Sequence, residues 1–256
     1  MSFRRGALLL AFVALGGALI LAVEAWLALR REYLPTEDPL ELRGSFGPSG
    51  IPPLRFVVLG DSTSAGIGVE RPADAYPTLL AERLAEEHRR RVELFVVGVS
   101  GARVADVLKE QVPKAIDLDP DVVFIGIGAN DVTHLTRLSA IRRDVGAALD
   151  LLAARTKATV VVAGAPDMRI AAWHEPLRSL AYLRGKQVTA VIEETARARD
   201  MPVVELAEQT GHFFAEDPDS HFSEDEFHPG REGYRRWADA IYPVLSRAVR
   251  DAAGSE

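Results

Sequence analysis

The chain has 256 residues, of which 48% are hydrophobic and 26% charged, a balance typical of a globular protein rather than a disordered one. Its formal net charge of −7 argues against nucleic acid as a partner, because nucleic-acid-binding domains present a basic face. Cysteine is absent, which excludes a disulfide framework, a thiolate nucleophile and Cys-ligated zinc.

The N-terminus predicts a membrane anchor. Two arginines precede seventeen uninterrupted apolar or small residues from Ala7 to Val23, and after one glutamate the apolar run continues to Leu29. A helix over residues 7–29 would be about 34 Å long, enough to cross a bilayer core. We therefore assign residues 1–31 to an N-terminal transmembrane anchor or signal segment.

The alternative for this segment is a cleaved secretory signal, because Val23-Glu24-Ala25 is an acceptable small-residue cleavage site after a cationic start. The length of the run and the arginines after it favour an uncleaved anchor. In both cases we expect a membrane-anchored or secreted protein whose folded domain is extracytoplasmic. Residues 35–53 hold five prolines and three glycines, so 32–53 is expected to be a linker and 54–256 the folded domain.

The folded domain alternates short apolar runs with amphipathic ones. Five runs rich in Val, Ile or Phe are expected to be parallel strands buried on both faces: 55–59, 92–97, 122–127, 159–163 and 202–205. Helix-length segments are 76–90, 102–115, 138–155, 178–199 and 231–250. This alternation predicts a three-layer α/β/α sandwich with a five-stranded parallel, doubly wound, flavodoxin-like sheet.

Chemistry-bearing residues follow three of these strands. Asp61-Ser62 comes after the first, Gly101 after the second and Asn130 after the third. In doubly wound sheets, ligands bind beyond the carboxyl ends of the strands, so these groups are expected at one edge of the sheet.

A serine nucleophile needs a base, a group that orients the base, and donors for an oxyanion. The candidate base is His228 in "SEDEFHPGREGY", and Asp225 lies three residues earlier, close enough to meet its Nδ1–H. That contact would leave Nε2 free to face Ser62. Candidate oxyanion donors are the backbone amides of Ser62 and Gly101 and the side-chain amide of Asn130.

Four blocks of the sequence resemble the SGNH/GDSL hydrolases. They are "GDS", the second glycine of "GVSG", "GAND" and "DEFHP", in the family's order and over about residues 54–250. The resemblance implies a serine esterase or acylhydrolase that forms an acyl-enzyme, with Ser62 as nucleophile, His228 as general base and Asp225 as its partner. It also implies an oxyanion hole made by Ser62, Gly101 and Asn130.

Parts of the sequence also fit other interpretations. Ser62 alone could be a helix cap, and the acidic run with His228 could be a solvated loop. Gly-x-Ser-x-Gly, Gly-x-Gly-x-x-Gly and a Walker lysine do not occur, which argues against an α/β-hydrolase or nucleotide-binding domain. A membrane-anchored carbohydrate- or lipid-binding protein on a hydrolase scaffold is the non-enzymatic alternative. No metal spacing or cofactor motif is present, so we expect neither.

The segment 165–182, "APDMRIAAWHEPLRSLAY", follows the fourth strand and should overhang the same edge of the sheet. Its larger apolar side chains either line a substrate pocket or pack under a long loop; they are Met168, Ile170, Trp173 and Leu177. The substrate class stays open among lipid esters, acetylated glycans, thioesters and small acyl esters. We expect a monomer that contacts the membrane through its N-terminal helix.

Overall fold

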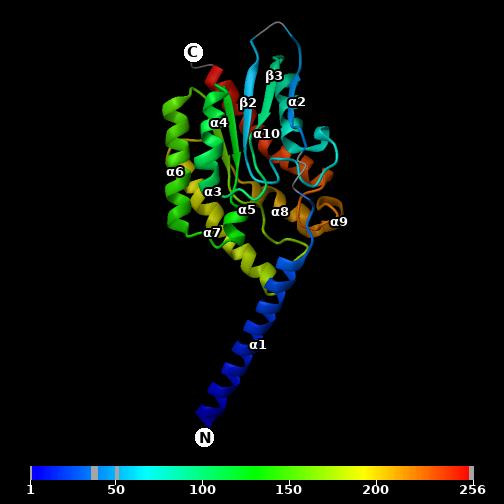
Figure 1. The fold of residues 1–256 in the computed structure, drawn as a ribbon, viewed down its shortest axis with the longest axis vertical. Coiled ribbons are helices and arrows are strands. Elements are labelled where there is room, and N and C mark those ends of the chain that lie inside the picture. Colours follow the sequence, from blue (N-terminus) through cyan, green and yellow to red (C-terminus); the bar gives the residue numbers. More distant parts are fainter. Residues whose placement is uncertain (1, 36–39, 50–51, 254–256) are drawn as a thin grey trace.

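The computed structural model describes residues 2–35, 40–49 and 52–253, although the side chains of residues 2–11, 13 and 14 lie outside this description. A long helix, α1 (Ser2–Arg30), projects from one end of the folded domain (Figure 1). The domain itself is a three-layer arrangement with helices on both faces of a central sheet (Figure 1).

The described residues form a six-stranded mixed sheet with the order β1-β3-β2-β4-β5-β6. The strands are β1 (Arg43–Phe46), β2 (Leu54–Gly60), β3 (Val92–Val96), β4 (Val122–Gly126), β5 (Thr159–Ala163) and β6 (Val203–Val204). The last five pair in parallel. Counted among themselves, these five have the order 2-1-3-4-5, which is the flavodoxin-like arrangement expected from the sequence.

The prediction of a five-stranded, all-parallel sheet is wrong in one respect. Strand β1 adds an antiparallel edge, with Arg43 opposite Phe95 and Phe46 opposite Val92. The four residues Arg-Gly-Ser-Phe carry neither an apolar run nor clear alternation, and β1 gains its hydrogen bonds only from β3. Residues 43–46 therefore belong to the sheet, although they lie inside the segment expected to be a linker.

The helices agree with the predicted ones at five places and add short elements near the sheet edge. They are α2 (Tyr76–His88), α3 (Val104–Asp106), α4 (Val112–Asp117), α5 (Ala129–Thr133), α6 (Leu138–Arg155), α7 (Leu177–Arg197), α8 (Leu206–Glu216), α9 (Pro218–His221) and α10 (Arg231–Ala253). A 3₁₀ turn, η1 (Pro72–Asp74), precedes α2, and a π-helical turn, η2 (Val107–Gln111), joins α3 to α4.

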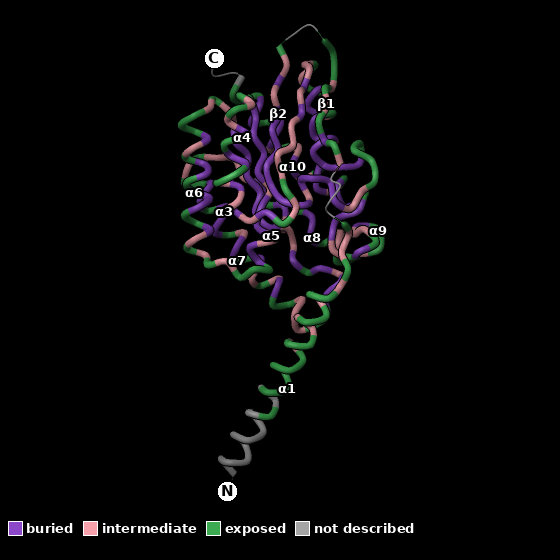
Figure 2. Tube along the Cα trace, viewed as in Figure 1, coloured by how far each residue is buried: buried purple, intermediate pink, exposed green. Residues whose placement is uncertain are grey.

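Strand β2 shows how the two faces of the sheet are filled. Because successive side chains of a strand point to opposite faces, Phe56 and Val58 pack with α2 and α10, whereas Val57 and Leu59 pack with α3, α4, α6 and α7. All four residues are fully buried, and Figure 2 shows the centre of the domain as buried. Because both faces are covered, the strand is apolar after Arg55, and the next polar residues, Asp61 and Ser62, follow its carboxyl end.

The segment expected to be a membrane anchor corresponds to α1, and part of it, residues 7–11, 13 and 14, has side chains outside the described set. Among the described residues, no helix combines the length and the apolar character needed to cross a bilayer. The described part of α1 is largely exposed, and in its last turns, which meet the domain, only some residues such as Ala25 and Ala28 are partly covered (Figure 2).

Candidate active site

Strand β2 delivers Ser62 to the edge of the sheet through a turn that requires glycine. Gly60 has φ +154°, and a Cβ there would lie 2.1 Å from Ser64 Oγ and 2.3 Å from the Gly126 carbonyl oxygen. The chain after Gly60 forms a turn, in which the backbone amide of Ile67 donates a hydrogen bond to the Ser62 carbonyl at 3.0 Å. Ser62 is therefore fixed directly after the strand.

The carboxylate of Asp61 braces this turn. Its Oδ1 accepts hydrogen bonds from the backbone amide of Thr63 at 3.0 Å and from the Thr63 hydroxyl at 2.9 Å. Burial raises the pKa of Asp61, an effect that the two Thr63 hydrogen bonds oppose. Asp61 thus stabilises the loop on which Ser62 stands.

Ser62, His228 and Asp225 form a continuous chain of hydrogen bonds. His228 Nε2 lies 3.0 Å from Ser62 Oγ, and His228 Nδ1 lies 2.7 Å from Asp225 Oδ2. All three residues are buried, with exposed fractions of 8% for Ser62, 5% for His228 and 6% for Asp225. The structure thus brings together the three residues that the sequence singled out, from opposite ends of the domain.

Asp225 lies in a dense set of donors. Its Oδ1 accepts from the Ser223 hydroxyl at 2.8 Å and from the amides of Phe227 and His228, each at 2.9 Å. Its Oδ2 accepts from His228 Nδ1 and from the amide of Leu34 at 3.2 Å. Burial alone would raise the pKa of Asp225, but the hydrogen bonds and charge of His228 and the Phe227 amide outweigh it and hold that pKa well below its usual range.

An ionised Asp225 fixes the tautomer of His228. A carboxylate can only accept, so Nδ1 must carry the proton and Nε2 must present its lone pair to Ser62 Oγ. In this state the imidazole can take the Ser62 proton while Asp225 stabilises the resulting positive charge. Within the described part of the chain, no three His, Asp or Glu side chains are grouped as metal ligands.

The other two candidate donors come from the loops after β3 and β4. Gly101 has φ +78°, in a turn, and a Cβ placed there would meet no described atom within 4 Å, so its backbone conformation, rather than a close approach, accounts for glycine. Asn130 lies in α5 beside Ser62, and one hydrogen of its side-chain amide is donated to the Ala102 carbonyl at 3.0 Å. Its amide nitrogen has a second hydrogen to offer a ligand.

A small cavity of about 50 Å³ opens beside Ser62, Asn130 and His228. Met168 and Ile170, two of the four predicted pocket residues, line it together with aromatic side chains from the C-terminal third of the chain. Trp173 packs instead against Phe227 with ring centroids 5.8 Å apart, and Leu177 packs against the hydrophobic core. A larger hollow of about 560 Å³ shares Phe214 and Phe222 with this cavity.

Two features of the site were missed in the sequence. Gln111 forms hydrogen bonds to both the amide and the carbonyl of Gly60, although a lone glutamine in a helix carries no signal of such a role. Leu34 reaches Asp225 from the segment expected to be a linker, where a backbone donor leaves no trace in the side-chain pattern. Both contacts are long-range and become visible only in three dimensions.

Comparisons with known proteins identify a relative among the esterases. The chain is 29% identical over 201 residues to a GDSL-like esterase of Mycobacterium tuberculosis, an alignment that covers 77% of this chain and 63% of the relative's length. The chain thus spans less than two thirds of that relative.

Solved structures share the fold at low sequence identity. A psychrotrophic esterase from Pseudoalteromonas sp., inhibited by monoethylphosphonate, superposes with a TM-score of 0.60 and 17% identity over 77% of this chain and 98% of its own. A phospholipase A1 from Streptomyces albidoflavus superposes with a TM-score of 0.60 and 22% identity over 77% of this chain and 99% of its own. The model of the GDSL-like Lipase/Acylhydrolase family matches residues 58–236, which include Ser62, Gly101, Asn130, Asp225 and His228. The chain belongs to the GDSL-like Lipase/Acylhydrolase family of hydrolases.

Proposed function

We propose that the chain is a serine esterase that hydrolyses carboxylic esters through a covalent acyl-enzyme. The observation that carries this proposal is the hydrogen-bonded chain from Asp225 through His228 to Ser62, with distances of 2.7 and 3.0 Å. A hydroxyl, a base and an orienting carboxylate in this order are what nucleophilic acyl transfer requires.

In the proposed reaction, Ser62 Oγ attacks the ester carbonyl carbon while His228 Nε2 takes the hydroxyl proton. The oxyanion accepts hydrogen bonds from the amides of Ser62 and Gly101 and from the side chain of Asn130. Collapse of the tetrahedral intermediate breaks the C–O bond, and His228 returns its proton to the departing alcohol. Water, deprotonated by His228, then attacks the acyl-enzyme and releases the acid and free Ser62.

The cavity beside Ser62 supports a short acyl group. Its volume of about 50 Å³ is a few times the roughly 10–15 Å³ that a cavity needs to hold one water molecule, which is room for a short acyl group. Met168 and Ile170 bound it and are 1% and 4% exposed, which leaves little freedom to widen it. We therefore place acetyl and similarly short esters before long-chain lipids as substrates.

We further propose that α1 anchors the protein to a membrane with the folded domain on the extracytoplasmic side. Apolar side chains on α1 are freely exposed, with Phe12 at 79%, Leu15 at 71% and Leu29 at 86%. Exposed large apolar side chains on one helix favour a lipid or protein environment. Retention in the membrane after carbonate extraction, with digestion of the domain by protease added to intact cells, is the expected result; protection of the domain would contradict the orientation.

Reaction with a fluorophosphonate probe tests the esterase assignment. Ser62→Ala is expected to abolish both labelling and p-nitrophenyl acetate hydrolysis while the protein keeps its circular dichroism spectrum. The matched control is Ser220→Ala, which removes an exposed hydroxyl on α9 and should leave both unchanged. Equal turnover by Ser62→Ala and the unaltered protein would refute the nucleophile, and a wild-type protein that is not labelled would favour the alternative of a non-catalytic carbohydrate- or lipid-binding protein.

A further inference from the structure

We propose that residues 28–34, the segment that joins α1 to the folded domain, are a positioning element for the carboxylate of Asp225. We call them the root segment. The inference rests on the proposed role of Asp225 in the reaction of Ser62 and His228. It assigns a function to a stretch that the sequence suggested was only the end of an anchor and the start of a linker.

The first observation is the hydrogen bond from the Leu34 amide to Asp225 Oδ2 at 3.2 Å. The other carboxylate oxygen, Oδ1, is held by donors of its own loop, residues 223–228. Among the described residues, Leu34 is the donor to Oδ2 that comes from outside this loop, and it shares that oxygen with His228 Nδ1. The Leu34 amide therefore helps to set the direction from which the carboxylate meets the imidazole.

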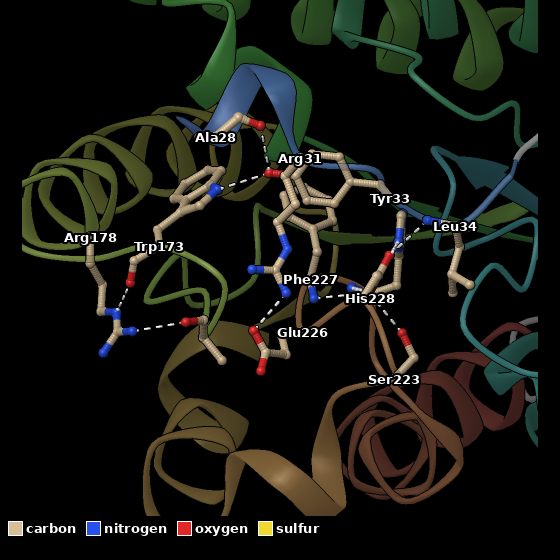
Figure 3. Close-up of polar contacts among 12 residues, drawn as sticks. Ala28, Arg31, Tyr33, Leu34, Trp173, Arg178, Ser223, Glu226, Phe227 and His228 are labelled. Atoms are coloured by element: carbon tan, nitrogen blue, oxygen red, sulfur yellow. Dashed lines mark hydrogen bonds and ion pairs between the residues drawn. The ribbon is translucent and has the colours of Figure 1, made fainter. Parts of the chain in front are cut away.

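The second observation is that Tyr33 fixes the root segment in place (Figure 3). Its hydroxyl donates to the Ala28 carbonyl at 3.0 Å and accepts from Trp173 Nε1 at 3.2 Å. Its ring lies 4.7 Å, centroid to centroid, from that of Phe227, the residue before His228. The Tyr33 side chain thus contacts the last turn of α1, the loop after β5 and the loop of Asp225 and His228.

The third observation is that the loop of Trp173 is itself held against the loop of Asp225. The Ala172 amide donates to the Glu226 carbonyl at 3.0 Å. Arg178 donates to the carbonyls of Trp173 at 2.6 Å and Ala171 at 2.9 Å (Figure 3). The root segment therefore packs against a loop that is held in place by its own hydrogen bonds.

An ion pair at the same place contributes less. Arg31 and Glu226 approach to 2.7 Å, but their side chains are 34% and 52% exposed, and exposed pairs add little stability. The amide of Leu34 and the side chain of Tyr33 are consequently the groups through which the root segment acts on Asp225. A disturbance of either therefore reaches the loop of Asp225 through a direct contact.

Leu34→Pro in the full chain tests the first contact, because proline has no amide hydrogen. Leu34→Ala is the matched control, since it shortens the same side chain and keeps the amide. With p-nitrophenyl acetate, Leu34→Pro is expected to lower kcat about tenfold, the effect of one lost hydrogen bond to a charged group, with KM nearly unchanged. Leu34→Ala should retain the wild-type kcat. Equal kcat values for the two variants would overturn the proposal.

Tyr33 provides a second test that does not depend on a proline being tolerated. Tyr33→Ala removes the hydroxyl and the ring contact and should lower kcat several-fold with KM nearly unchanged. Tyr33→Phe keeps the ring on Phe227 and should recover most of that loss. Glu86→Ala, at an exposed position of α2 outside the root segment, is the control and should match wild type. A wild-type kcat for Tyr33→Ala would contradict a positioning role. The same would follow if Tyr33→Ala and Tyr33→Phe lost kcat to the same extent and were also equally destabilised against heat.

Fluorophosphonate labelling of the wild-type protein separates this proposal from the proposed function. If wild type is not labelled and Ser62→Ala keeps its activity, the esterase mechanism itself is wrong. If wild type is labelled at Ser62 and hydrolyses the ester, while Leu34→Pro and Tyr33→Ala react at the wild-type rate, only the role of the root segment is refuted.

Discussion

Gln111 and Gly60 form a reciprocal pair of hydrogen bonds. The Gly60 amide donates to Gln111 Oε1 at 2.9 Å, and Gln111 Nε2 donates to the Gly60 carbonyl at 2.8 Å. Gln111 is 1% exposed and lies in the π-helical turn η2, so a helix on one face of the sheet fixes the last residue of β2. We call this pair of hydrogen bonds the Gln111–Gly60 clamp. Because Ser62 lies two residues after Gly60, we expect the clamp to help hold Ser62 in position.

Gln111→Met is expected to lower the free energy of unfolding by about 1–3 kcal/mol, because it leaves the buried Gly60 amide without its partner. Urea unfolding followed by circular dichroism measures this change. The control is Gln209→Met, at an exposed position of α8, which should change stability little. If the two variants unfold at the same urea concentration, the clamp contributes nothing to stability.

The lowered pKa of Asp225 predicts that the free energy of unfolding depends on pH. The pKa of Asp225 is depressed in the folded state, so in acid the unfolded chain takes up the proton first. The stabilisation is therefore present above the unfolded-state pKa of about 3.9 and is lost as the pH falls through the depressed pKa of the folded state.

Asp225→Asn removes this titration, so its stability should fall less steeply between pH 5 and pH 2 (an order-of-magnitude window) than that of wild type. Chemical unfolding at a series of pH values measures the two slopes. Asp219→Asn, an exposed aspartate of α9, is the control and should follow the wild-type curve. If the free energy of unfolding falls with pH equally steeply in Asp225→Asn and wild type, the pKa of Asp225 is not lowered in the folded state.

Asn130 is predicted to stabilise the oxyanion. Asn130→Ala should lower kcat by about 10²–10³ with little change in KM, because the donated hydrogen bond strengthens in the transition state. Steady-state kinetics with p-nitrophenyl acetate give both constants. Thr133→Ala, which alters an exposed side chain on the same short helix α5, should retain nearly full activity; a loss comparable to that of Asn130→Ala would point to general damage to α5.

Ile170 is predicted to limit acyl chain length. Ile170→Ala enlarges the small cavity beside Ser62 and should raise the ratio of butyrate to acetate hydrolysis several-fold, although it destabilises the fold by about 2–5 kcal/mol. The matched control is Ile141→Ala, the same truncation at a fully buried position of α6. That variant should lose stability without changing the ratio. An unchanged ratio in Ile170→Ala would place the acyl group elsewhere.

The sequence predicted those parts of the fold that local pattern encodes. The five parallel strands are apolar on both faces, so β2, β3, β4, β5 and β6 were found within a few residues. Strand β1 was missed because Arg43–Phe46 pairs along one edge only and keeps a mixed composition. The short helices α5 and α9 were missed because four or five residues cannot display a helical period. Helix α8, with 11 residues, was missed as well.

The candidate site also contains residues that the sequence predicted and one that it placed wrongly. Ser62, Asp225 and His228 were predicted from short sequence blocks and lie in one hydrogen-bonded chain, whereas the roles of Gly101 and Asn130 stay predictions. Trp173 was grouped with Met168 and Ile170 by its place in one loop, yet it turns away from the cavity and binds Tyr33. Residues of an irregular loop follow no periodicity, so the sequence does not show which of their side chains line the cavity and which pack elsewhere.

The sequence by itself therefore predicted the family, the places of the parallel strands and the three residues of the hydrogen-bonded chain, because these depend on local composition and motif order. Only the tertiary structure decided how those residues are held. The contacts of Gln111 with Gly60 and of Leu34 with Asp225 use backbone groups brought together over 51 and 191 residues of chain. Every residue other than proline carries the same backbone amide, so its partner is set by packing and not by the identity of its side chain.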